Sequence, residues 1–286
     1  MKILVCGATG TTGSEVLRQL HAAGVPARAM TRSSDSAQQL RARDTETVLA
    51  DLADPGSLPG ALDGVSGVYL ASPASPDLAA HEANLASAAA RAGVGHLVKL
   101  SVIGCAADSP ITFGRMHHEA EEALRASGVP CTMVRPNGFM QNTLAWAGQL
   151  AGGAVYGPVM DARWSIVDVR DVAALAVAAL RDPDTHAGRS YTATGPEASS
   201  PREQVAILAE LLGRELAARE VPIEQAKESM IQSGWPEWTV ERMGELFHLY
   251  ADGLAQQVSP DVASVTGSAP RSFREFAADH LAAFAG

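Results

Sequence analysis

Three glycines near the start of the chain have the spacing of a phosphate-binding turn. Gly7, Gly10 and Gly13 follow a G-x-x-G-x-x-G pattern in the stretch GATGTTG. Residues without a Cβ atom let the backbone bend sharply and let a diphosphate approach it closely. The free N–H groups and the positive dipole end of a following helix would bind that anion. The spacing therefore predicts a dinucleotide site, and the alternative is a tight turn in another kind of α/β protein.

The segments on either side of the glycines fit a dinucleotide site. Residues 3–5 are Ile, Leu and Val, as expected of a strand that is buried on both faces of a parallel sheet. Apolar residues then recur at helical spacing after Ser14, and Gly24 marks the predicted end of that helix. A strand, a glycine turn and a helix in this order are far more specific than a glycine pattern alone.

The residues after the second predicted strand indicate which dinucleotide binds. This strand is expected at residues 25–30, and Thr31, Arg32 and Ser33 follow it. An NAD site would carry an Asp or Glu here, which accepts hydrogen bonds from the ribose hydroxyls. The planar guanidinium of Arg32 suits the 2′-phosphate of NADP instead. An ordinary solvated arginine is the alternative, and Asp35 would reverse the assignment if the strand ended later.

Strands and helices alternate through the first two thirds of the chain. This alternation predicts a doubly wound parallel sheet, a Rossmann fold, with further strands at residues 45–50, 67–71, 96–101 and 129–134. Asp51 follows one of these strands and could accept the adenine amino group, or could cap the next segment as Asp54 could. Ser72 and Pro73 are expected near the cofactor's sugar, and Ser101 ends its strand.

The pattern changes beyond the sixth predicted strand. The loop at residues 135–142 should lie on the ligand edge of the sheet, with Phe139 and Met140 as apolar walls. Later strands are predicted at residues 164–169 and 188–194, and helices at residues 171–180, 201–212, 223–233, 236–254 and 272–284. Ser200, with Glu203 three residues on, is expected to cap the helix at residues 201–212, and Pro201 is expected at its first position. We expect an NAD(P)-binding domain at residues 1–194 and a smaller, mainly helical cap at residues 195–286, which returns to the sheet and forms one structural unit with it. Four aromatic residues of this cap are expected either to line the substrate site or to pack in the core of the cap: Trp235, Trp238, Phe247 and Tyr250.

Composition narrows the class of protein. The chain has 286 residues, of which 47% are hydrophobic, and a net charge of −10, which argues against a nucleic-acid partner. The separated cysteines Cys6, Cys105 and Cys131 predict buried free thiols in a reducing cytoplasm. We expect no leader peptide, because no basic-then-apolar segment precedes the glycine turn, and no membrane span, because the sequence has no run of about 18 apolar residues. The expected assembly is a monomer or a homodimer.

The order of the motifs resembles the NmrA-like family of atypical short-chain dehydrogenases, and it does so over the whole chain. The matching stretches are GATGTTG (7–13), TRS (31–33), DLADPGSL (51–58), VKLSVIG (98–104), VRPNGFMQN (134–142), VDVRDVA (167–173) and TGSAPRSFREF (266–276). Within the family, the chain is most similar to the bacterial NADPH-dependent quinone oxidoreductases and azoreductases.

This resemblance implies an NADP site, with NADPH preferred over NADH. The expected cofactor-binding residues are Gly7, Thr9, Gly10, Thr11, Thr12, Gly13, Thr31, Arg32, Ser33, Asp51, Leu52, Ala71, Ser72, Pro73, Ser101, Pro136, Asn137, Phe139 and Met140. A metal site is not expected, because the consecutive histidines His117 and His118 cannot share one helix face.

The chain also departs from the short-chain dehydrogenases that reduce carbonyls. Those enzymes use a Tyr-x-x-x-Lys pair, whereas the corresponding helix here has Phe113 and His117. Phenylalanine cannot donate a proton, so a quinone, whose reduced anion takes a proton from solvent, is an easier acceptor. His117 is the candidate catalytic residue, as proton donor or as hydrogen-bond partner of the nicotinamide ribose. The alternative is an exposed helix histidine paired with Glu121.

Three functions stay open on this basis. The resemblance implies an NADPH-dependent oxidoreductase that passes hydride to a quinone-like or azo acceptor, and the aromatic residues of the cap favour it. The missing tyrosine favours a redox sensor that binds NADP and a protein partner without turnover. A reductase or isomerase that acts on one specific metabolite is the third possibility.

Overall fold

The computed structural model describes residues 1–285 and divides into two compact units. Unit 1 comprises Met1–Ser109, Phe113–Arg135 and Val172–Thr192, whereas unit 2 comprises Pro110–Thr112, Pro136–Asp171 and the residues from Ala193 onward. The boundary expected at residue 194 differs from this division, because residues 136–171 group with the C-terminal residues. Long-range hydrogen bonds explain the grouping: Asn137 Nδ2, for example, donates to the Ala255 carbonyl at 2.9 Å.

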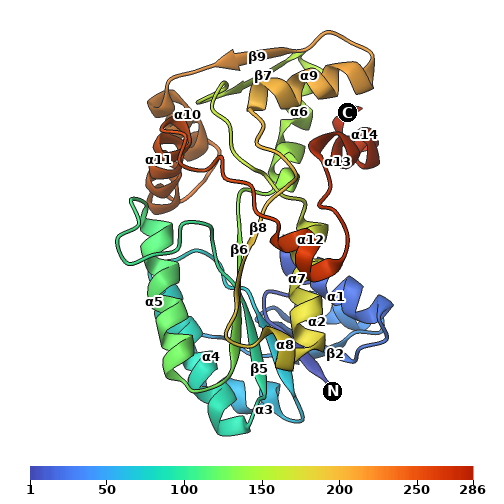
Figure 1. Cartoon of the computed structure of the whole chain (residues 1–286), viewed down its shortest axis with the longest axis vertical. Coiled ribbons are helices and arrows are strands. Elements are labelled where there is room, and N and C mark those ends of the chain that lie inside the picture. Colours follow the sequence, from blue (N-terminus) through green and yellow to red (C-terminus); the bar gives the residue numbers. More distant parts are fainter. Residues whose placement is uncertain (286) are drawn as a thin grey trace. The chain divides into compact units, whose positions relative to one another are not determined.

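A seven-stranded sheet forms the centre of unit 1 (Figure 1). Its strands, in chain order, are β1 (Ile3–Val5), β2 (Ala27–Thr31), β3 (Glu46–Leu49), β4 (Gly67–Leu70), β5 (His96–Leu100), β6 (Cys131–Pro136) and β8 (Ser190–Ala193). The order across the sheet is β3-β2-β1-β4-β5-β6-β8, and the neighbours from β3 to β6 pair in parallel. The predicted doubly wound sheet is confirmed.

The strand order reverses next to β1. The chain runs outward from β1 through β2 to β3, and then returns to β4 on the other side of β1. Ligands of doubly wound folds bind outside the carboxyl ends of the strands at such a reversal. All three residues of β1 are fully buried, as the apolar run predicts. The glycine stretch therefore begins at the topologically favoured place for a cofactor.

Helices cover both faces of the sheet of unit 1. They are α1 (Thr11–Ala22), α2 (Ser34–Arg41), the 3₁₀ turn η1 (Pro55–Ser57), α3 (Leu58–Leu62), α4 (Leu78–Ala92), α5 (Thr112–Ala126), α7 (Val169–Arg181) and α8 (Pro183–His186). Figure 1 shows α4 and α5 on one side of the sheet, with α1 and α7 on the other. The core beneath α4 joins buried residues of several strands and helices, including Leu4, Leu62, Leu85, Leu97 and Met133.

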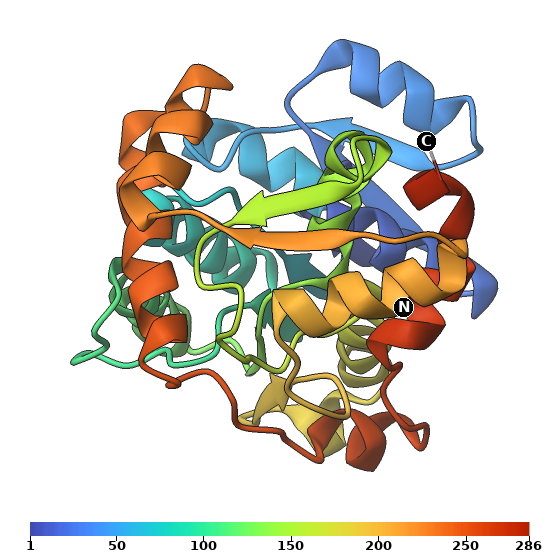
Figure 2. The ribbon, with the colours of Figure 1, turned by 90° about the horizontal axis from the view of Figure 1, so that it is seen from above.

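Unit 2 contains a second, two-stranded sheet that the sequence patterns did not predict. It pairs β7 (Ala154–Gly157) in parallel with β9 (Ala217–Glu220), and Figure 2 shows the two strands side by side. Both strands are only four residues long and lie more than sixty residues apart, so neither has a strong local signature. The expectation of a mainly helical region beyond residue 195 missed β9 for this reason.

The helices of unit 2 follow the predicted positions more closely. They are the 3₁₀ helix η2 (Met140–Trp146), α6 (Ala147–Ala151), α9 (Pro201–Leu212), α10 (Ile223–Gln232), α11 (Glu237–Ala251), α12 (Asp261–Thr266), α13 (Phe273–Asp279) and α14 (Leu281–Ala285). Ser200 and Glu203 form a capping box at the start of α9, with Pro201 in the first turn, as predicted.

Two predicted elements are wrong. Residues 164–169 form no strand: Trp164 and Val167 make one isolated bridge each, and α7 already begins at Val169. The single helix expected at residues 272–284 is two helices that meet at His280. The His280 ring nitrogen Nδ1 lies 2.8 Å from the Phe276 carbonyl, where it competes with the backbone for the helix acceptor.

The remaining predictions about the chain concern thiols and membranes. Cys6, Cys105 and Cys131 are free and buried, as the sequence predicts. Within residues 1–285, no helix combines the length and the apolar character that a membrane span needs.

Candidate functional site

The predicted glycine turn is confirmed, and each of its glycines has a steric reason. Gly7 has a φ of +70°, and a Cβ atom there would lie 2.6 Å from the Ala71 carbonyl oxygen. A Cβ atom at Gly13 would overlap the Gly7 carbonyl oxygen, and the Gly10 amide donates to that same oxygen at 2.9 Å. The turn is therefore as tight as its backbone permits, and the absent side chains leave a cradle that fits a diphosphate.

The start of α1 supplies hydrogen-bond donors to that cradle. Gly10 caps the helix through its backbone alone, and the first turn reads Thr-Thr-Gly-Ser. The first amides of a helix have no partner within it, and they favour an anion together with the helix dipole. Thr9, Gly10 and Thr11 are exposed, whereas Thr12 is buried and contributes to packing. The arrangement can bind phosphate oxygens through backbone N–H groups.

The surroundings of Arg32 favour a role in binding phosphate. Strand β2 ends at Thr31, and Asp35 lies in the first turn of α2, so the later strand end that would favour Asp35 does not occur. Ser33 caps α2 and accepts the Ser36 amide. The Arg32 side chain is 68% exposed, and its Nη1 lies 3.9 Å from Asp51 Oδ2. An exposed ion pair of this length is weak, so the guanidinium is available to a ligand.

The residues after β3 divide into caps and core. Asp51 Oδ1 accepts the Ala53 amide at 3.0 Å, and Asp54 caps η1 by accepting the Gly56 amide. Asp54 is therefore the cap of η1, whereas Asp51 bonds its own turn and keeps its second oxygen beside Arg32. Leu52 is 8% exposed and packs in the core, which leaves only its backbone for a ligand.

A buried polar chain connects the loop after β4 with α5. Ser72 Oγ donates to Glu82 Oε1 at 2.6 Å, and Glu82 Oε2 pairs with Lys99 Nζ at 2.6 Å. Lys99 Nζ lies 3.1 Å from Nδ1 of His117. Sequence reasoning named Ser72 and His117 but missed the two charged residues between them. A lysine inside the apolar strand HLVKL and a glutamate in an alanine-rich helix are the signals that could have found them.

His117 is half-buried and is not paired with Glu121 as the alternative interpretation expects. Burial and the nearby Lys99 ammonium lower the pKa of His117 to about 3, although the Glu121 carboxylate acts in the opposite direction. The ring is therefore neutral at physiological pH. Glu121 instead accepts hydrogen bonds from Ser101, Arg125 and Arg135. Burial raises the pKa of Glu121, but the bonds from Arg135 and Ser101 outweigh it and lower the pKa to about 2.

Three of the expected cofactor residues have their side chains occupied inside the protein. Ser101 is 2% exposed and donates to Glu121 at 2.6 Å. Asn137 Nδ2 donates to Ser165 Oγ and to a backbone carbonyl, while its Oδ1 accepts the Gly138 amide. Met140 is fully enclosed in the core of unit 2. Contact with a cofactor at these positions would use the backbone.

A cavity of about 780 Å³ lies within unit 2. Its walls come from η2, β7, α9, α10, α11 and the segment around residue 164, with aromatic side chains from Phe139, Trp146, Tyr156, Trp164, Trp235, Phe247 and Tyr250. Across residues 1–285, every side chain that lines it is uncharged. Three of the four aromatic residues expected as walls lie here, whereas Trp238 packs under the Arg242 guanidinium, 6.0 Å away. The volume suits an organic ring system of moderate size.

Two polar atoms in this cavity converge beside Gly138. The rings of Trp164 and Tyr250 stack with centroids 4.3 Å apart and an interplanar angle of 2°. A Cβ atom at Gly138 would lie 3.3 Å from both Trp164 Nε1 and the Tyr250 hydroxyl. Neither donor has a hydrogen-bond partner among the described residues, and burial raises the pKa of Tyr250. Both donors are thus available to a ligand's oxygen or nitrogen.

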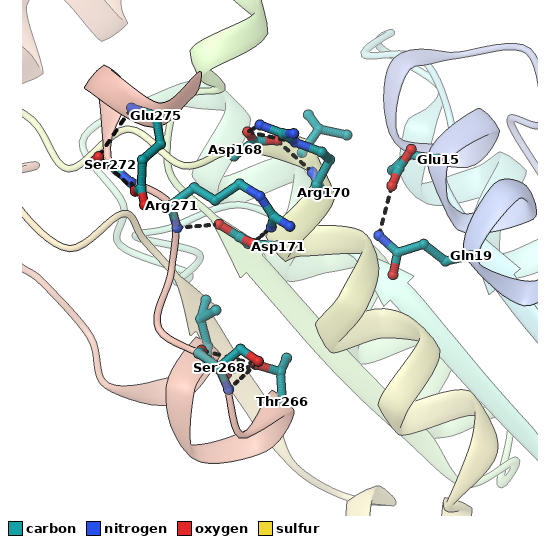
Figure 3. A network of polar contacts seen from close by, with 12 residues as sticks. Glu15, Gln19, Asp168, Arg170, Asp171, Thr266, Ser268, Arg271, Ser272 and Glu275 are labelled. Atoms are coloured by element: carbon teal, nitrogen blue, oxygen red, sulfur yellow. Dashed lines mark hydrogen bonds and ion pairs between the residues drawn. The ribbon is translucent and has the colours of Figure 1, made fainter. Parts of the chain in front are cut away.

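A polar network fixes the loop that carries Gly138 and Phe139. Gln141 Nε2 donates to Asp168 Oδ1 at 2.9 Å, and Gln141 Oε1 accepts the Val169 amide. Figure 3 shows Arg170 folded back onto Asp168 and Arg271 turned toward Asp171. The stretches VRPNGFMQN, VDVRDVA and TGSAPRSFREF therefore meet through their side chains. Through Gln141, this network is connected to the loop whose residues Gly138 and Phe139 line the cavity.

Comparisons with known proteins agree over the whole length of the chain. A sequence model of the NmrA-like family matches residues 1–277. An NAD(P)H azoreductase from Xenophilus azovorans is 41% identical over 283 residues, which cover 99% of each chain. A (4-alkanoyl-5-oxo-2,5-dihydrofuran-3-yl)methyl phosphate reductase from Streptomyces griseus subsp. griseus is 40% identical over 287 residues, again 99% of each chain.

A solved structure supports the same grouping. The NADPH-dependent quinone oxidoreductase from Escherichia coli, complexed with NADPH, is 25% identical and superposes with a TM-score of 0.86. The match covers 98% of this chain and 99% of that chain.

Proposed function

Because the chain belongs to the NmrA-like family, we propose that it transfers hydride from NADPH to a flat, uncharged aromatic acceptor of the quinone or azo class. The chain is an NAD(P)H-dependent oxidoreductase whose cofactor is NADP, as full-length reductase relatives and the NADPH complex of a similar structure support. The cavity of unit 2 is the observation that carries the acceptor class, since its walls are aromatic and uncharged.

The cofactor half of the proposal concerns residues of unit 1. Bound NADPH supplies a hydride, which carries two electrons. We assign the diphosphate to the glycine cradle and the first turn of α1, where a Cβ atom would clash and backbone amides are available. We assign the 2′-phosphate to Arg32, whose exposed fork of donors fits phosphate.

The second part of the proposal, that the acceptor is uncharged, follows from the lining of the cavity. The two relatives of about 40% identity are named for different substrates, one of which carries a phosphate, so identity alone does not choose between them. A phosphate or sulfonate in an uncharged cavity would lose its hydration without gaining an ionic partner. A neutral quinone or azo compound loses little hydration free energy when it enters this cavity. Trp164 Nε1 and the Tyr250 hydroxyl can also donate hydrogen bonds to its oxygen or nitrogen.

Helix α5 carries no Tyr-x-x-x-Lys pair to protonate the product. From the family resemblance we assign Phe113 to the position at which carbonyl reductases of the wider class carry their tyrosine, and His117 is neutral beside Lys99. A quinone that receives hydride becomes a resonance-stabilised anion, and water can supply its proton. Acceptors of this kind therefore suit the side chains present, whereas simple ketones, whose alkoxide product needs an immediate acid, do not.

Matched pairs of acceptors test this proposal. NADPH oxidation would be followed with 1,4-naphthoquinone and its 2-sulfonate, and with 4-dimethylaminoazobenzene and its 4′-sulfonate. We expect kcat/KM to be at least about tenfold higher for the neutral member of each pair, because burial of an unpaired charge is unfavourable. The sulfonate makes the quinone more electrophilic, so a preference for the neutral quinone cannot come from intrinsic reactivity. A preference for the sulfonates would contradict the acceptor class.

Phe113 also favours a second candidate, a sensor that binds NADP without turnover. The same experiment separates the two. Tight NADPH binding with no oxidation by either acceptor pair would favour the sensor, and any steady-state turnover with them would exclude it.

A further inference from the structure

A lysine and a glutamate are completely enclosed beneath α5. Lys99 lies in the middle of β5 and Glu82 in α4, and both side chains have an exposed fraction of 0%. Transfer of two charges from water into a protein interior is unfavourable, and their mutual attraction seldom returns much more than that loss. The pair therefore contributes little to stability relative to apolar residues. Its partners suggest a different purpose.

The Lys99 ammonium, which has three N–H donors, lies against three polar partners, of which the first forms an ion pair and the other two are hydrogen-bond partners. They are Glu82 Oε2 at 2.6 Å, the Leu100 carbonyl at 3.2 Å and His117 Nδ1 at 3.1 Å. An ammonium group has no lone pair and can only donate. His117 Nδ1 must therefore accept, which means that it carries no proton. A neutral imidazole then has its one proton on Nε2.

We propose that Lys99, held in place by Glu82, is a positioning residue that fixes His117 as a neutral imidazole with its proton on Nε2. His117 thus offers a hydrogen-bond donor at Nε2 and has no imidazolium proton to give. This selects between the two roles that the sequence leaves open, a proton donor or a hydrogen-bond partner, in favour of the second. Ser72 completes the arrangement, because its hydroxyl holds the other oxygen of Glu82.

The other charged groups around His117 do not reverse this assignment. Glu121 lies one turn further along α5 and would favour an imidazolium, but its carboxylate is already engaged by Arg125, Arg135 and Ser101. Lys99 faces the ring from β5, with Glu82 of α4 behind it. Burial and Lys99 together outweigh Glu121, in agreement with the lowered pKa of His117.

Nitrogen NMR of the full chain tests the proposal directly. The protein would be labelled with ¹⁵N at histidine, and the His117 signals would be assigned with a His117→Gln variant. We expect Nδ1 to show the shift of an unprotonated nitrogen and Nε2 that of a protonated one, unchanged between about pH 5 and 8. A proton on Nδ1, or a ring that titrates in that range, would overturn the proposal.

Variants test whether Lys99 is the reason that His117 carries its proton on Nε2. The double variant Glu82→Gln/Lys99→Met removes both charges and so avoids an unpaired buried carboxylate. We expect its His117 to show both tautomers and a raised pKa, whereas the exposed Glu122→Gln change on the same helix should leave the spectrum unchanged. If the double variant folds and keeps a pure Nε2 proton, Lys99 is not the positioning residue. A variant that fails to fold leaves the wild-type spectrum as the deciding result.

These spectra need neither NADPH nor an acceptor. The spectra can therefore overturn the proposed protonation state of His117 without affecting the proposed function. The acceptor assays can likewise overturn the proposed function without affecting the protonation state.

Discussion

Arg32 is the residue on which cofactor choice depends. Its guanidinium follows β2 directly and is mostly exposed, with only a long contact to Asp51. Replacement of Arg32 with Ala should therefore weaken NADPH binding by about 10- to 100-fold, the loss expected for one or two charge-assisted hydrogen bonds. The NADH affinity should change little, because NADH has no 2′-phosphate. Fluorescence titration with each cofactor measures both dissociation constants.

Two results would refine the role of Arg32. The Arg32→Lys variant should retain part of the preference for NADPH, since it keeps the charge but loses the planar fork. The exposed Arg91 on α4 offers a matched control, and Arg91→Ala should leave both affinities unchanged. Equal losses of NADPH and NADH affinity in Arg32→Ala would show that Arg32 does not read the phosphate.

Glu121 should make the stability of the protein sensitive to acid. The pKa of this buried carboxyl is lowered from 4.5 to about 2 in the folded chain, so its charged form stabilises the fold. That contribution is fully present above the unfolded pKa and is lost as the pH falls toward about 2. A difference of this size corresponds to a loss on the order of 3 kcal/mol. Urea unfolding between about pH 5 and 3 measures the larger part of this loss.

The Glu121→Gln variant is the comparison for this pH effect. Its free energy of unfolding should be lower than that of the wild type at neutral pH, because the Arg135 guanidinium loses its ionic partner and one of its two acceptor oxygens. Its decline with acid should be shallower than that of the wild type. Parallel pH curves for the two proteins would show that Glu121 does not carry the effect.

At the scale of helices, strands and turns, the sequence predicted most of the elements that are specified by residues close together in the chain. The glycine turn, the strands β1 to β6 and the capping box of α9 all depend on residues close together in the chain. β7 and β9 depend on a pairing across more than sixty residues, and the segment around Trp164 is extended without belonging to a sheet. The convergence of Trp164, Tyr250 and Gly138 likewise joins distant segments, and no spacing rule predicts it.

The turn between β1 and α1 is the element whose geometry is most restrictive. A Gly13→Ala substitution would place a methyl group against the Gly7 carbonyl oxygen, so the turn must open. We expect a loss of about 1–3 kcal/mol in the free energy of unfolding, together with weaker binding of both NADPH and NADH. Gly60→Ala in α3 is the matched control, because nothing lies within 4 Å of its added methyl group. Similar losses in both variants would contradict this account of the turn.

At the scale of the whole molecule, the two units carry different parts of the proposed reaction. The glycine cradle, Arg32 and the Glu82–Lys99–His117 chain belong to unit 1, whereas the uncharged cavity belongs to unit 2. The family resemblance indicated both the cofactor and the reaction type in advance. The acceptor class depended on the cavity, whose lining comes from segments between residues 138 and 250.

This separation predicts that acceptor use and cofactor affinity can be changed independently. In unit 2, a Gly138→Val substitution would fill the space beside Trp164 Nε1 and the Tyr250 hydroxyl, each 3.3 Å from the first added carbon. We expect kcat/KM for 1,4-naphthoquinone to fall by about tenfold or more. A lost hydrogen bond or a displaced acceptor that raises the activation free energy by about 1.4 kcal/mol has that effect. The NADPH dissociation constant should stay unchanged, because the glycine cradle and Arg32 are untouched.

Gly148→Val, at an exposed position of α6 with nothing within 4 Å of an added Cβ, is the control and should alter neither quantity. An unchanged kcat/KM in Gly138→Val would mean that the acceptor binds elsewhere, whereas a loss of NADPH affinity would mean that the loop at Gly138 serves the cofactor instead.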